Sequence, residues 1–444
     1  MLRACRCVGA LMFVTAIAAH ATEPAAVQSD SPAAVQSESP AATQSDSLDW
    51  PRLFGPTGDS VVPEQPLDLK RIESKLPILW ELEIGESYTS PSIVGNRMVL
   101  FHRLADQETV DCLDVATQER IWRHQYPTRY IDRYGYNNGP RSTPIIIDGV
   151  VYTLGAEGKM NALKLKDGEK IWSRWLNRDF KVDQDFFGVG GSPCLDGDQL
   201  IINVGGTETD AGIVAIDRKT GDTRWHSTSD GPSYATPVVA TIHGKRFAFV
   251  FTKAGLVELD ANTGKVIWSI PFRSRLYESV NASSPIVVGD VVLVSATYGT
   301  GALAVRIKPD GSAEELWRSV TSMDSHFSNL MAEDGMVFGF AGRHEGDAEL
   351  RCIELETGKI KWSVPSVLGR GSMVRISKEF LLWGERGHLL VRTLDPMAAP
   401  ELPDDPRDGK SLLRYPCWTP PVVVASRLYL RNETRIICFD LKPN

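Results

Sequence analysis

The chain has 444 residues and a formal net charge of −8, from 48 basic and 56 acidic side chains, with no run of lysine or arginine. This balance argues against nucleic acid as a partner, because nucleic-acid-binding proteins gather basic residues on one surface. After the N-terminus no apolar run is long enough to cross a bilayer, so the sequence predicts no transmembrane segment.

The N-terminus has the organisation of a secretory signal peptide. Arg3 and Arg6 form a positive segment, residues 8–19 are apolar, and residues 19–21 form a small-x-small cleavage site. We therefore predict a signal peptide over residues 1–21 and a periplasmic or extracellular product.

Three similar octads follow, PAAVQSDS, PAAVQSES and PAATQSDS. Short side chains, regular prolines and scattered acids cannot bury a core, so residues 22–49 are predicted to be a disordered linker. Residues 50–444 exceed the usual length of one compact domain, unless that domain is built of repeats. We predict a single repeat domain over this range.

The phrase LDANTGKVIW at residues 259–268 is typical of a strand, a tight turn and a second strand, with Gly264 supplying a positive φ. The phrase recurs, and its closing tryptophans from Trp122 to Trp362 lie 50, 53, 43, 49 and 45 residues apart. This is the length of a β-propeller blade, a four-stranded antiparallel sheet. The tryptophans predicted to dock between neighbouring blades are Trp80, Trp122, Trp172, Trp225, Trp268, Trp317 and Trp362.

A second hairpin precedes each copy and often begins with Ser-Pro or Thr-Pro. Proline suits the start of an inner strand because it has no N–H to donate. Eight such starts occur, at Ser90, Thr143, Ser192, Thr236, Ser284, Asn329, Ser372 and Thr419. The sequence therefore predicts an all-β, eight-bladed propeller, in which the N-terminal strand around Trp80 completes the C-terminal blade and closes the ring. The seventh blade is irregular, and we expect its outer strand at residues 411–414.

Five cysteines follow the predicted signal peptide, and three of them share one position in the repeat. These are Cys112, Cys352 and Cys438, where other copies have Ala162 and Ala215. A small buried residue fits this position, so structural thiols are favoured over a disulfide or a metal site.

These repeats resemble the quinoprotein-like eight-bladed propellers that carry the PQQ tryptophan-docking repeat. The matching stretches are residues 50–56 with 58–59, 135–144, 298–301, 368–372 and 428–431. That family includes pyrroloquinoline quinone (PQQ) alcohol dehydrogenases and a non-catalytic outer-membrane assembly lipoprotein. The chain is most similar to exported PQQ-like repeat proteins of planctomycete-type bacteria. The resemblance implies the fold but no particular activity, because members share the scaffold without sharing a reaction.

Resemblance to the dehydrogenases of that family implies PQQ, a Ca²⁺ ion held by acidic and amide side chains, a catalytic Asp and a vicinal disulfide. This chain has no adjacent cysteine pair, and it carries no haem, serine-hydrolase or zinc-protease motif. Glu278, Asn281 and Asp324 are the residues available for the calcium and base roles. Residues 183–185 begin like a calcium loop but lack its glycine and distal glutamate. We therefore expect no catalytic residue, no metal and no cofactor, with PQQ and calcium reserved for the alternative below.

The segments that join one blade to the next hold the polar and aromatic exceptions to the repeat. In a propeller these connections reach one face around the central axis. Arginine, tyrosine, asparagine and histidine gathered there suit a carboxylated or sugar-like ligand, whereas pairing of the arginines with acids on neighbouring blades is the structural alternative. The candidate ligand-binding residues are Tyr88, Arg141, Tyr234, Asn281, His326, Arg370 and Trp418.

Two functions from different classes fit this pattern. The first is an exported, non-catalytic, monomeric propeller that presents its loops to an envelope protein or polysaccharide. The alternative is a PQQ-dependent oxidoreductase that acts on an alcohol or a sugar.

Overall fold

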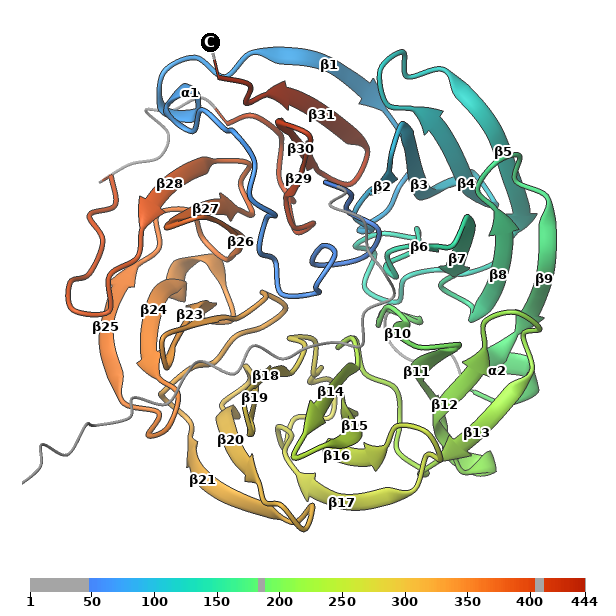
Figure 1. Ribbon diagram of the computed structural model, residues 1–444, viewed down its shortest axis with the longest axis vertical. Coiled ribbons are helices and arrows are strands. Elements are labelled where there is room, and N and C mark those ends of the chain that lie inside the picture. Colours follow the sequence, from blue (N-terminus) through green and yellow to red (C-terminus); the bar gives the residue numbers. More distant parts are fainter. Residues whose placement is uncertain (1–47, 183–187, 404–410, 444) are drawn as a thin grey trace, which may run out of the picture. The chain divides into compact units, whose positions relative to one another are not determined.

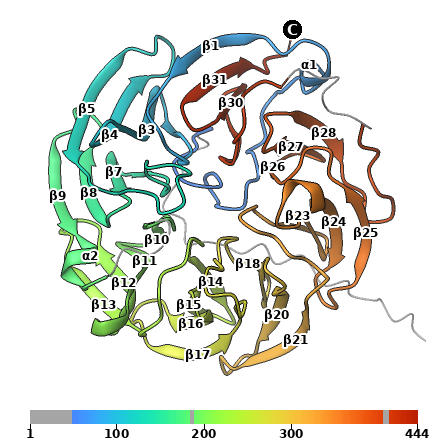
Figure 2. The same cartoon turned by 180° about the vertical axis from the view of Figure 1, so that it is seen from behind.

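The strands of the computed structural model form eight antiparallel sheets around one axis (Figure 1), and the view from behind shows the same ring (Figure 2). The structure describes residues 48–182, 188–403 and 411–443. The chain divides into two units, residues 1–36 and 37–444, and every described residue belongs to the second. The predicted eight-bladed propeller is confirmed, whereas the predicted signal peptide and almost all of the predicted linker lie outside the described residues.

The blades are numbered in chain order. Within each blade the strands are given from the inner strand, nearest the axis, to the outer one. Blade 1 contains β2 (Ser92–Val94), β3 (Arg97–Leu104), β4 (Gln107–Asp114) and β5 (Arg120–Pro127). Blade 2 contains β6 (Ile145–Ile147), β7 (Val150–Leu154), β8 (Lys159–Lys164) and β9 (Lys170–Trp175). Blade 3 contains β10 (Cys194–Asp196), β11 (Gln199–Gly206), β12 (Ala211–Asp217) and β13 (Thr223–Ser227). Blade 4 contains β14 (Val238–Ile242), β15 (Lys245–Phe251), β16 (Gly255–Asp260) and β17 (Val266–Pro271).

The second half of the ring follows the same order. Blade 5 contains β18 (Ile286–Val288), β19 (Val291–Ala296), β20 (Gly301–Ile307) and β21 (Ala313–Ser319). Blade 6 contains β22 (Met331–Glu333), β23 (Met336–Ala341), β24 (Glu349–Glu354) and β25 (Ile360–Pro365). Blade 7 contains β26 (Gly371–Ile376), β27 (Glu379–Gly384) and β28 (Leu389–Thr393), and blade 8 contains β29 (Val422–Val424), β30 (Arg427–Arg431), β31 (Arg435–Asp440) and β1 (Ile78–Glu83). The short helices are α1 (Lys70–Glu73), α2 (Leu176–Asp179), η1 (Thr207–Thr209) and η2 (Glu345–Asp347).

The N-terminal strand closes the ring, as the sequence predicts. β1 pairs antiparallel with β31, and Trp80 lies opposite Cys438. Arg431, a fully buried arginine on β30, donates to the carbonyl oxygens of Ser87 and Thr89 in the connection from β1 to β2. The two ends of the chain are therefore joined by a strand pair and by a buried hydrogen-bond network.

Blade 7 differs from the expectation, because residues 411–414 do not form its outer strand. Its sheet has the order β26-β27-β28 among the described residues. Leu412 instead donates its N–H to Gly387 O, in the turn between β27 and β28. Helix α1 packs against β28, and Arg392 on β28 pairs with Glu73 of α1 at 2.7 Å. The free edge of β28 is thus partly covered by a segment from the other end of the chain.

Most of the predicted docking tryptophans bridge neighbouring blades. The indole Nε1 of Trp122, Trp172, Trp225, Trp317 and Trp362 donates to a main-chain carbonyl of the following blade at 2.8–3.2 Å. Four of these rings also lie on the glycine of the next blade's turn. A Cβ added at Gly168, Gly221, Gly264 or Gly358 would come within 2.3–2.8 Å of the ring. Glycine is needed there because any larger residue would displace the indole.

The Ser/Thr-Pro series has a second role that the sequence interpretation missed. The N–H of Ser90 donates to Thr143 Oγ1, the N–H of Thr143 to Ser192 Oγ, that of Ser192 to Thr236 Oγ1, and that of Thr236 to Ser284 Oγ. These hydroxyls form a chain of hydrogen bonds from blade to blade around the inner strands. Asn329 replaces the hydroxyl residue in blade 6 and bonds both the N–H and the carbonyl of Met373.

Removing one hydroxyl from this chain should weaken the fold. Thr143→Val leaves the buried N–H of Ser90 without an acceptor and should lower the free energy of unfolding by about 1–3 kcal/mol. Thr143→Ser keeps the acceptor and should cost less. Urea unfolding of the two variants measures the difference, and a loss for Thr143→Ser as large as that for Thr143→Val would mean that the hydrogen bond contributes no more than the packing of one methyl group.

Residues 48–62, which precede β1, lie at the centre of the ring (Figure 1). Trp50 bridges to Ile93 on β2, and Ile146 on β6 donates its N–H to Pro51 O. On the opposite side Asn329 donates its Nδ2 to Ser60 Oγ at 2.9 Å. The propeller therefore contains its own central plug, which the sequence interpretation noted only as part of the resemblance.

Candidate functional site

The interblade connections and the turns between second and third strands meet on one face of the propeller, here called the loop face. Tyr88, in the connection from β1 to β2, donates its hydroxyl to Glu433 Oε1 at 2.7 Å. Glu433 lies in the turn from β30 to β31 and also accepts from Asn137 Nδ2, in the connection from β5 to β6. Burial and the bond to Glu433 raise the pKa of Tyr88, so this phenol stays neutral.

Four aromatic rings surround the indole of Trp418 on the loop face, and we call these five residues the loop-face aromatic cluster. The ring of Trp418 lies 5.2 Å from Tyr88, 5.6 Å from Phe327, 5.9 Å from Tyr415 and 6.1 Å from Tyr136, between centroids. Tyr136 is 57% exposed and Tyr415 is 54% exposed. The cluster thus joins rings from four connections, and two of them present large faces to solvent.

A buried ion pair holds this cluster in place. Arg370 binds the fully buried Glu385 through Nε at 3.0 Å and Nη2 at 2.6 Å, and the Nε1 of Trp418 donates to the same carboxylate at 3.0 Å. The guanidinium also lies over the rings of Phe327 and Trp418, at 5.1 and 5.6 Å from their centroids. Glu385 therefore fixes both the cation and the central indole.

His326 is neutral and its two ring nitrogens are both engaged. Its Nδ1 lies 3.0 Å from Arg370 Nη1, which can only donate, so Nδ1 accepts and the proton sits on Nε2. Nε2 then donates to the hydroxyl oxygen of Tyr298 at 3.1 Å. Burial, together with the charges of Arg370 and Arg343, lowers the pKa of His326 to about 3. This imidazole is thus a hydrogen-bond relay and has no free lone pair to act as a base.

Arg141 anchors the loop that carries Tyr136. Its Nη2 binds Asp132 Oδ2 at 2.6 Å, and Asp132 Oδ1 accepts the N–H of Tyr134 at 2.8 Å. The guanidinium also lies over the rings of Tyr88 and Tyr130, at 5.5 and 5.4 Å from their centroids. The loop is therefore rigid although several of its side chains are exposed.

Tyr234 and Asn281 lie together in another part of the loop face. The N–H of Tyr234 donates to Asn281 O at 2.9 Å, and the ring of Tyr234 packs beside Gly190. The side chain of Asn281 is buried and donates its Nδ2 to Thr252 O at 2.8 Å. The structure thus brings together five of the seven candidate residues, Tyr88, Arg141, His326, Arg370 and Trp418, and places Tyr234 and Asn281 beside each other.

The sequence interpretation missed the acids that hold the candidate residues: Glu385 binds Arg370, Asp132 binds Arg141, and Glu433 binds Tyr88. Glu385 and Glu433 lie in turns between second and third strands, and Asp132 lies in the loop before Arg141. In a propeller those turns reach the same face as the interblade connections. The spacing of the repeat places Glu385 in such a turn, so this rule would have predicted Glu385 on the loop face.

The residues considered for a quinone and calcium do not form such a site. Asp324 pairs with Arg351 at 3.3 Å, Asn281 bonds main-chain oxygens, and Glu278 is exposed. Residues 183–185 lie outside the described residues. In the part of the chain that the structure describes, no group of three or more His, Cys, Asp or Glu side chains is placed to hold a metal ion. The acids beside the loop-face aromatic cluster are already engaged, Glu385 and Asp132 by arginines and Glu433 by Tyr88 and Asn137, so the donor set does not fit a calcium-bound quinone.

The five cysteines that the structure describes are free thiols. Cys112, Cys352, Cys417 and Cys438 are buried, and Cys194 is half-buried. Burial raises the pKa of each thiol, to about 12 for Cys112 and Cys438. These thiols are therefore unreactive packing residues.

Comparison with known proteins adds the family. The PQQ_2 family model, described as outer membrane protein assembly factor BamB, matches residues 75–201 and 106–364. The chain belongs to this family. Both matched ranges lie within the repeat domain, so the PQQ_2 assignment rests on the blades themselves.

The curated relatives that match this chain include quinoprotein dehydrogenases and BamB proteins. Quinoprotein ethanol dehydrogenase of Pseudomonas aeruginosa is 28% identical over 169 residues, which are 34% of this chain and 26% of the dehydrogenase. BamB of Burkholderia pseudomallei is 20% identical over 230 residues, which are 50% of this chain and 55% of that protein. The match thus spans about half or less of the length of these relatives.

Solved structures with the same architecture also come from both groups. BamB from Moraxella catarrhalis has a TM-score of 0.57 at 15% identity, over 82% of this chain and 99% of that one. Quinohemoprotein alcohol dehydrogenase from Comamonas testosteroni has a TM-score of 0.59 at 14% identity, over 91% and 82%. At these identities the likeness shows the fold alone. None of the helices in the described ranges is long and apolar enough to cross a membrane.

Proposed function

We propose that this chain is an exported, non-catalytic binding propeller of the cell envelope, which holds a protein or polysaccharide partner on its loop face. The observation that carries the proposal is the loop-face aromatic cluster, whose exposed rings are fixed by buried ion pairs. Rigid tyrosine and tryptophan side chains give a large contact area at little entropic cost, and they are enriched in binding interfaces.

Other exposed apolar side chains lie in the same class of segment. Besides Tyr136 and Tyr415, the large exposed hydrophobic residues of the interblade connections are Ile131, Tyr134, Leu276, Tyr277, Val320 and Met397. Apolar side chains that gather on one face of a soluble protein mark a contact surface more often than singly scattered ones do.

The chemistry around the cluster supports recognition over catalysis. The imidazole of His326 bonds on both nitrogens, and Glu385 and Asp132 are each paired with an arginine. A general acid or base needs a proton or lone pair that is free to reach a substrate. These groups instead hold the aromatic rings in position.

Photocrosslinking in the native host tests the proposal. A photoreactive amino acid at position 136 or 415 should give a specific crosslinked product, whereas the same group at the exposed outer-strand residue Ile171 should not. The double variant Tyr136→Ala/Tyr415→Ala should weaken recovery of that partner by roughly 30-fold or more, because a single buried interface tyrosine already contributes about 2 kcal/mol. Equal products at all three positions would remove the loop face as the binding surface.

The enzyme alternative has its own test. Purified full-length protein is incubated with PQQ and Ca²⁺, and quinone retention and reduction of an artificial acceptor with alcohols and aldoses are measured. Retained quinone with acceptor reduction would overturn the non-catalytic assignment, whereas loss of the quinone on gel filtration is the expected result.

A further inference from the structure

The junction between blades 4 and 5 departs from the pattern of its neighbours. On the third strand of each four-stranded blade, one residue lies opposite the docking tryptophan. In the other blades this residue is small or a thiol: Cys112, Ala162, Ala215, Ala304, Cys352 and Cys438. In blade 4 it is Glu258, a fully buried carboxyl opposite Trp268.

Trp268 also lacks the interblade hydrogen bond that five other tryptophans make. Its Nε1 is buried and has no hydrogen-bond partner in the part of the chain that the structure describes. The carbonyl that corresponds to the usual acceptor is Ile307 O, since the N–H of Ile307 donates to Asp290 O in the same way that Leu355 donates to Gly335 O. Ile307 O instead accepts from His243 Nε2 at 2.9 Å.

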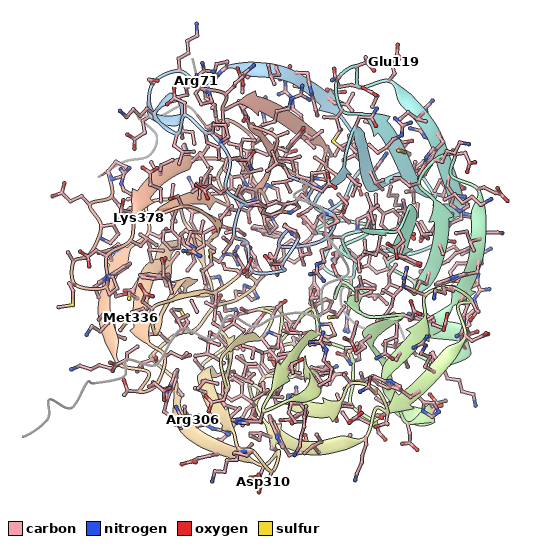
Figure 3. All side chains as sticks on the ribbon, in the orientation of Figure 1. Arg71, Glu119, Arg306, Asp310, Met336 and Lys378 are labelled. Carbon is pink, nitrogen blue, oxygen red and sulfur yellow. The ribbon has the colours of Figure 1, made fainter. Side chains whose placement is uncertain are left out.

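The glycine contact is missing at this junction as well. A Cβ at Gly311, in the blade 5 turn, would meet Ile267 Cγ2 and Phe247 Cζ at 3.9 Å and no tryptophan. Figure 3 shows Asp310 of the same turn at the outer edge of the ring. The ring of Trp268 lies 6.5 Å from that of Phe249 in its own blade, a contact of the kind that the docked Trp172 and Trp362 also make, so the missing interblade contacts are what set Trp268 apart. The indole is thus turned toward Glu258 and away from the usual docking site.

The surroundings of Glu258 decide its charge. Both carboxyl oxygens lack a hydrogen-bond partner, and the Trp268 N–H is near enough to lower the pKa of the carboxyl without reaching hydrogen-bond geometry. Lys245 on β15 also lowers it, and no charged group of β17 or of the described strands of blade 5 acts on it. Burial outweighs both effects and raises the pKa of Glu258 to about 8.

We propose that Glu258 makes the blade 4–blade 5 junction a pH-sensitive seam, which is closed while the carboxyl is protonated and loosens when the carboxyl ionises. An ionised carboxylate without donors cannot stay in an apolar slot, and it reaches water only if β17 separates from blade 5. The proton is released to solvent. The other described tryptophan junctions lack this element because a small residue or a thiol occupies the position.

The sign of the pH dependence follows from the two pKa values. The pKa of Glu258 is about 8 in the folded protein and about 4.3 in an unfolded chain. The stabilising contribution of the protonated group is therefore complete below pH about 4.3, and it is lost progressively as the pH rises through about 8. Acidic conditions should tighten this seam.

Amide hydrogen exchange between pH 5 and 9 tests the seam in the full chain. The variant Glu258→Ala installs the residue that blade 3 has at Ala215, and Glu258→Gln keeps the size without the charge. For β16 and β17 we compare the amide protection factor of the wild type with that of either variant. The ratio of wild type to variant should fall by up to about tenfold for each pH unit, up to pH 8. The same ratio for β7 and β8 in blade 2 should not change.

Two outcomes would overturn the proposal. A ratio that stays constant with pH in β16 and β17 would mean that Glu258 does not titrate with opening. A fall of equal size in blade 2 would mean that ionisation loosens the whole ring and not one seam. If Glu258→Ala does not fold, Glu258→Gln gives the same comparison.

Discussion

Arg370→Met should lower the free energy of unfolding by about 3–5 kcal/mol, the largest effect that we expect from a single substitution on the loop face. The change leaves Glu385 buried without its cation, and the carboxylate keeps only the N–H of residue 370 and Trp418 Nε1 as donors. The double variant Arg370→Met/Glu385→Leu removes both charges and should recover much of the loss. Denaturant unfolding of these two variants and of Glu385→Leu measures the coupling between the two residues.

Arg386 provides a matched control in the same turn. It pairs with Glu345, and both side chains are more than 40% exposed. Because exposed ion pairs contribute little, Arg386→Met should cost less than about 1 kcal/mol. A loss at Arg386 as large as that at Arg370 would show that burial of the pair does not decide its contribution.

Gly264→Ala should lower the free energy of unfolding by about 2–5 kcal/mol. The backbone φ of Gly264 is +70°, and a Cβ there would lie 2.3 Å from the ring of Trp225. Left-handed backbone costs an alanine about 1–2 kcal/mol, and displacing a packed indole costs about 1–3 kcal/mol more. The same substitution should weaken the bond from Trp225 Nε1 to Ala261 O, so tryptophan fluorescence reports the displacement.

Gly311→Ala separates the two causes. Gly311 has a φ of +93° in the blade 5 turn, but its Cβ would meet no atom closer than 3.9 Å. The backbone cost should therefore be present without the clash, and the variant should lose less stability than Gly264→Ala. Equal losses would mean that docking of the indole on glycine contributes little.

Much of the fold could be predicted because each blade repeats the same local instructions. The signals are turn glycines, strand-initiating prolines and regularly spaced tryptophans. Because each acts through short-range geometry, the strands and turns that they define can be predicted from sequence. Ring closure through Trp80 could also be predicted, because one orphan strand and one incomplete blade have a single solution that leaves no free edge.

The segments that depart from the repeat could not be predicted from the sequence. Residues 411–414 carry no repeat signal, and contacts with the β27–β28 turn, not strand pairing, fix their position. The plug at residues 50–60 is likewise held by strands that lie far apart in sequence, among them β2, β6 and β26.

The sequence by itself determined the eight-bladed scaffold, the closing strand and the face on which the variable segments gather. Only the tertiary structure decided how those segments are held, because the positions of Arg370 and Trp418 depend on Glu385, and the tautomer of His326 depends on Arg370. It also decided that Trp268, which fits the repeat in sequence, turns toward Glu258. Repeats specify local geometry, whereas the partners of a buried charge are set by long-range packing that no local pattern records.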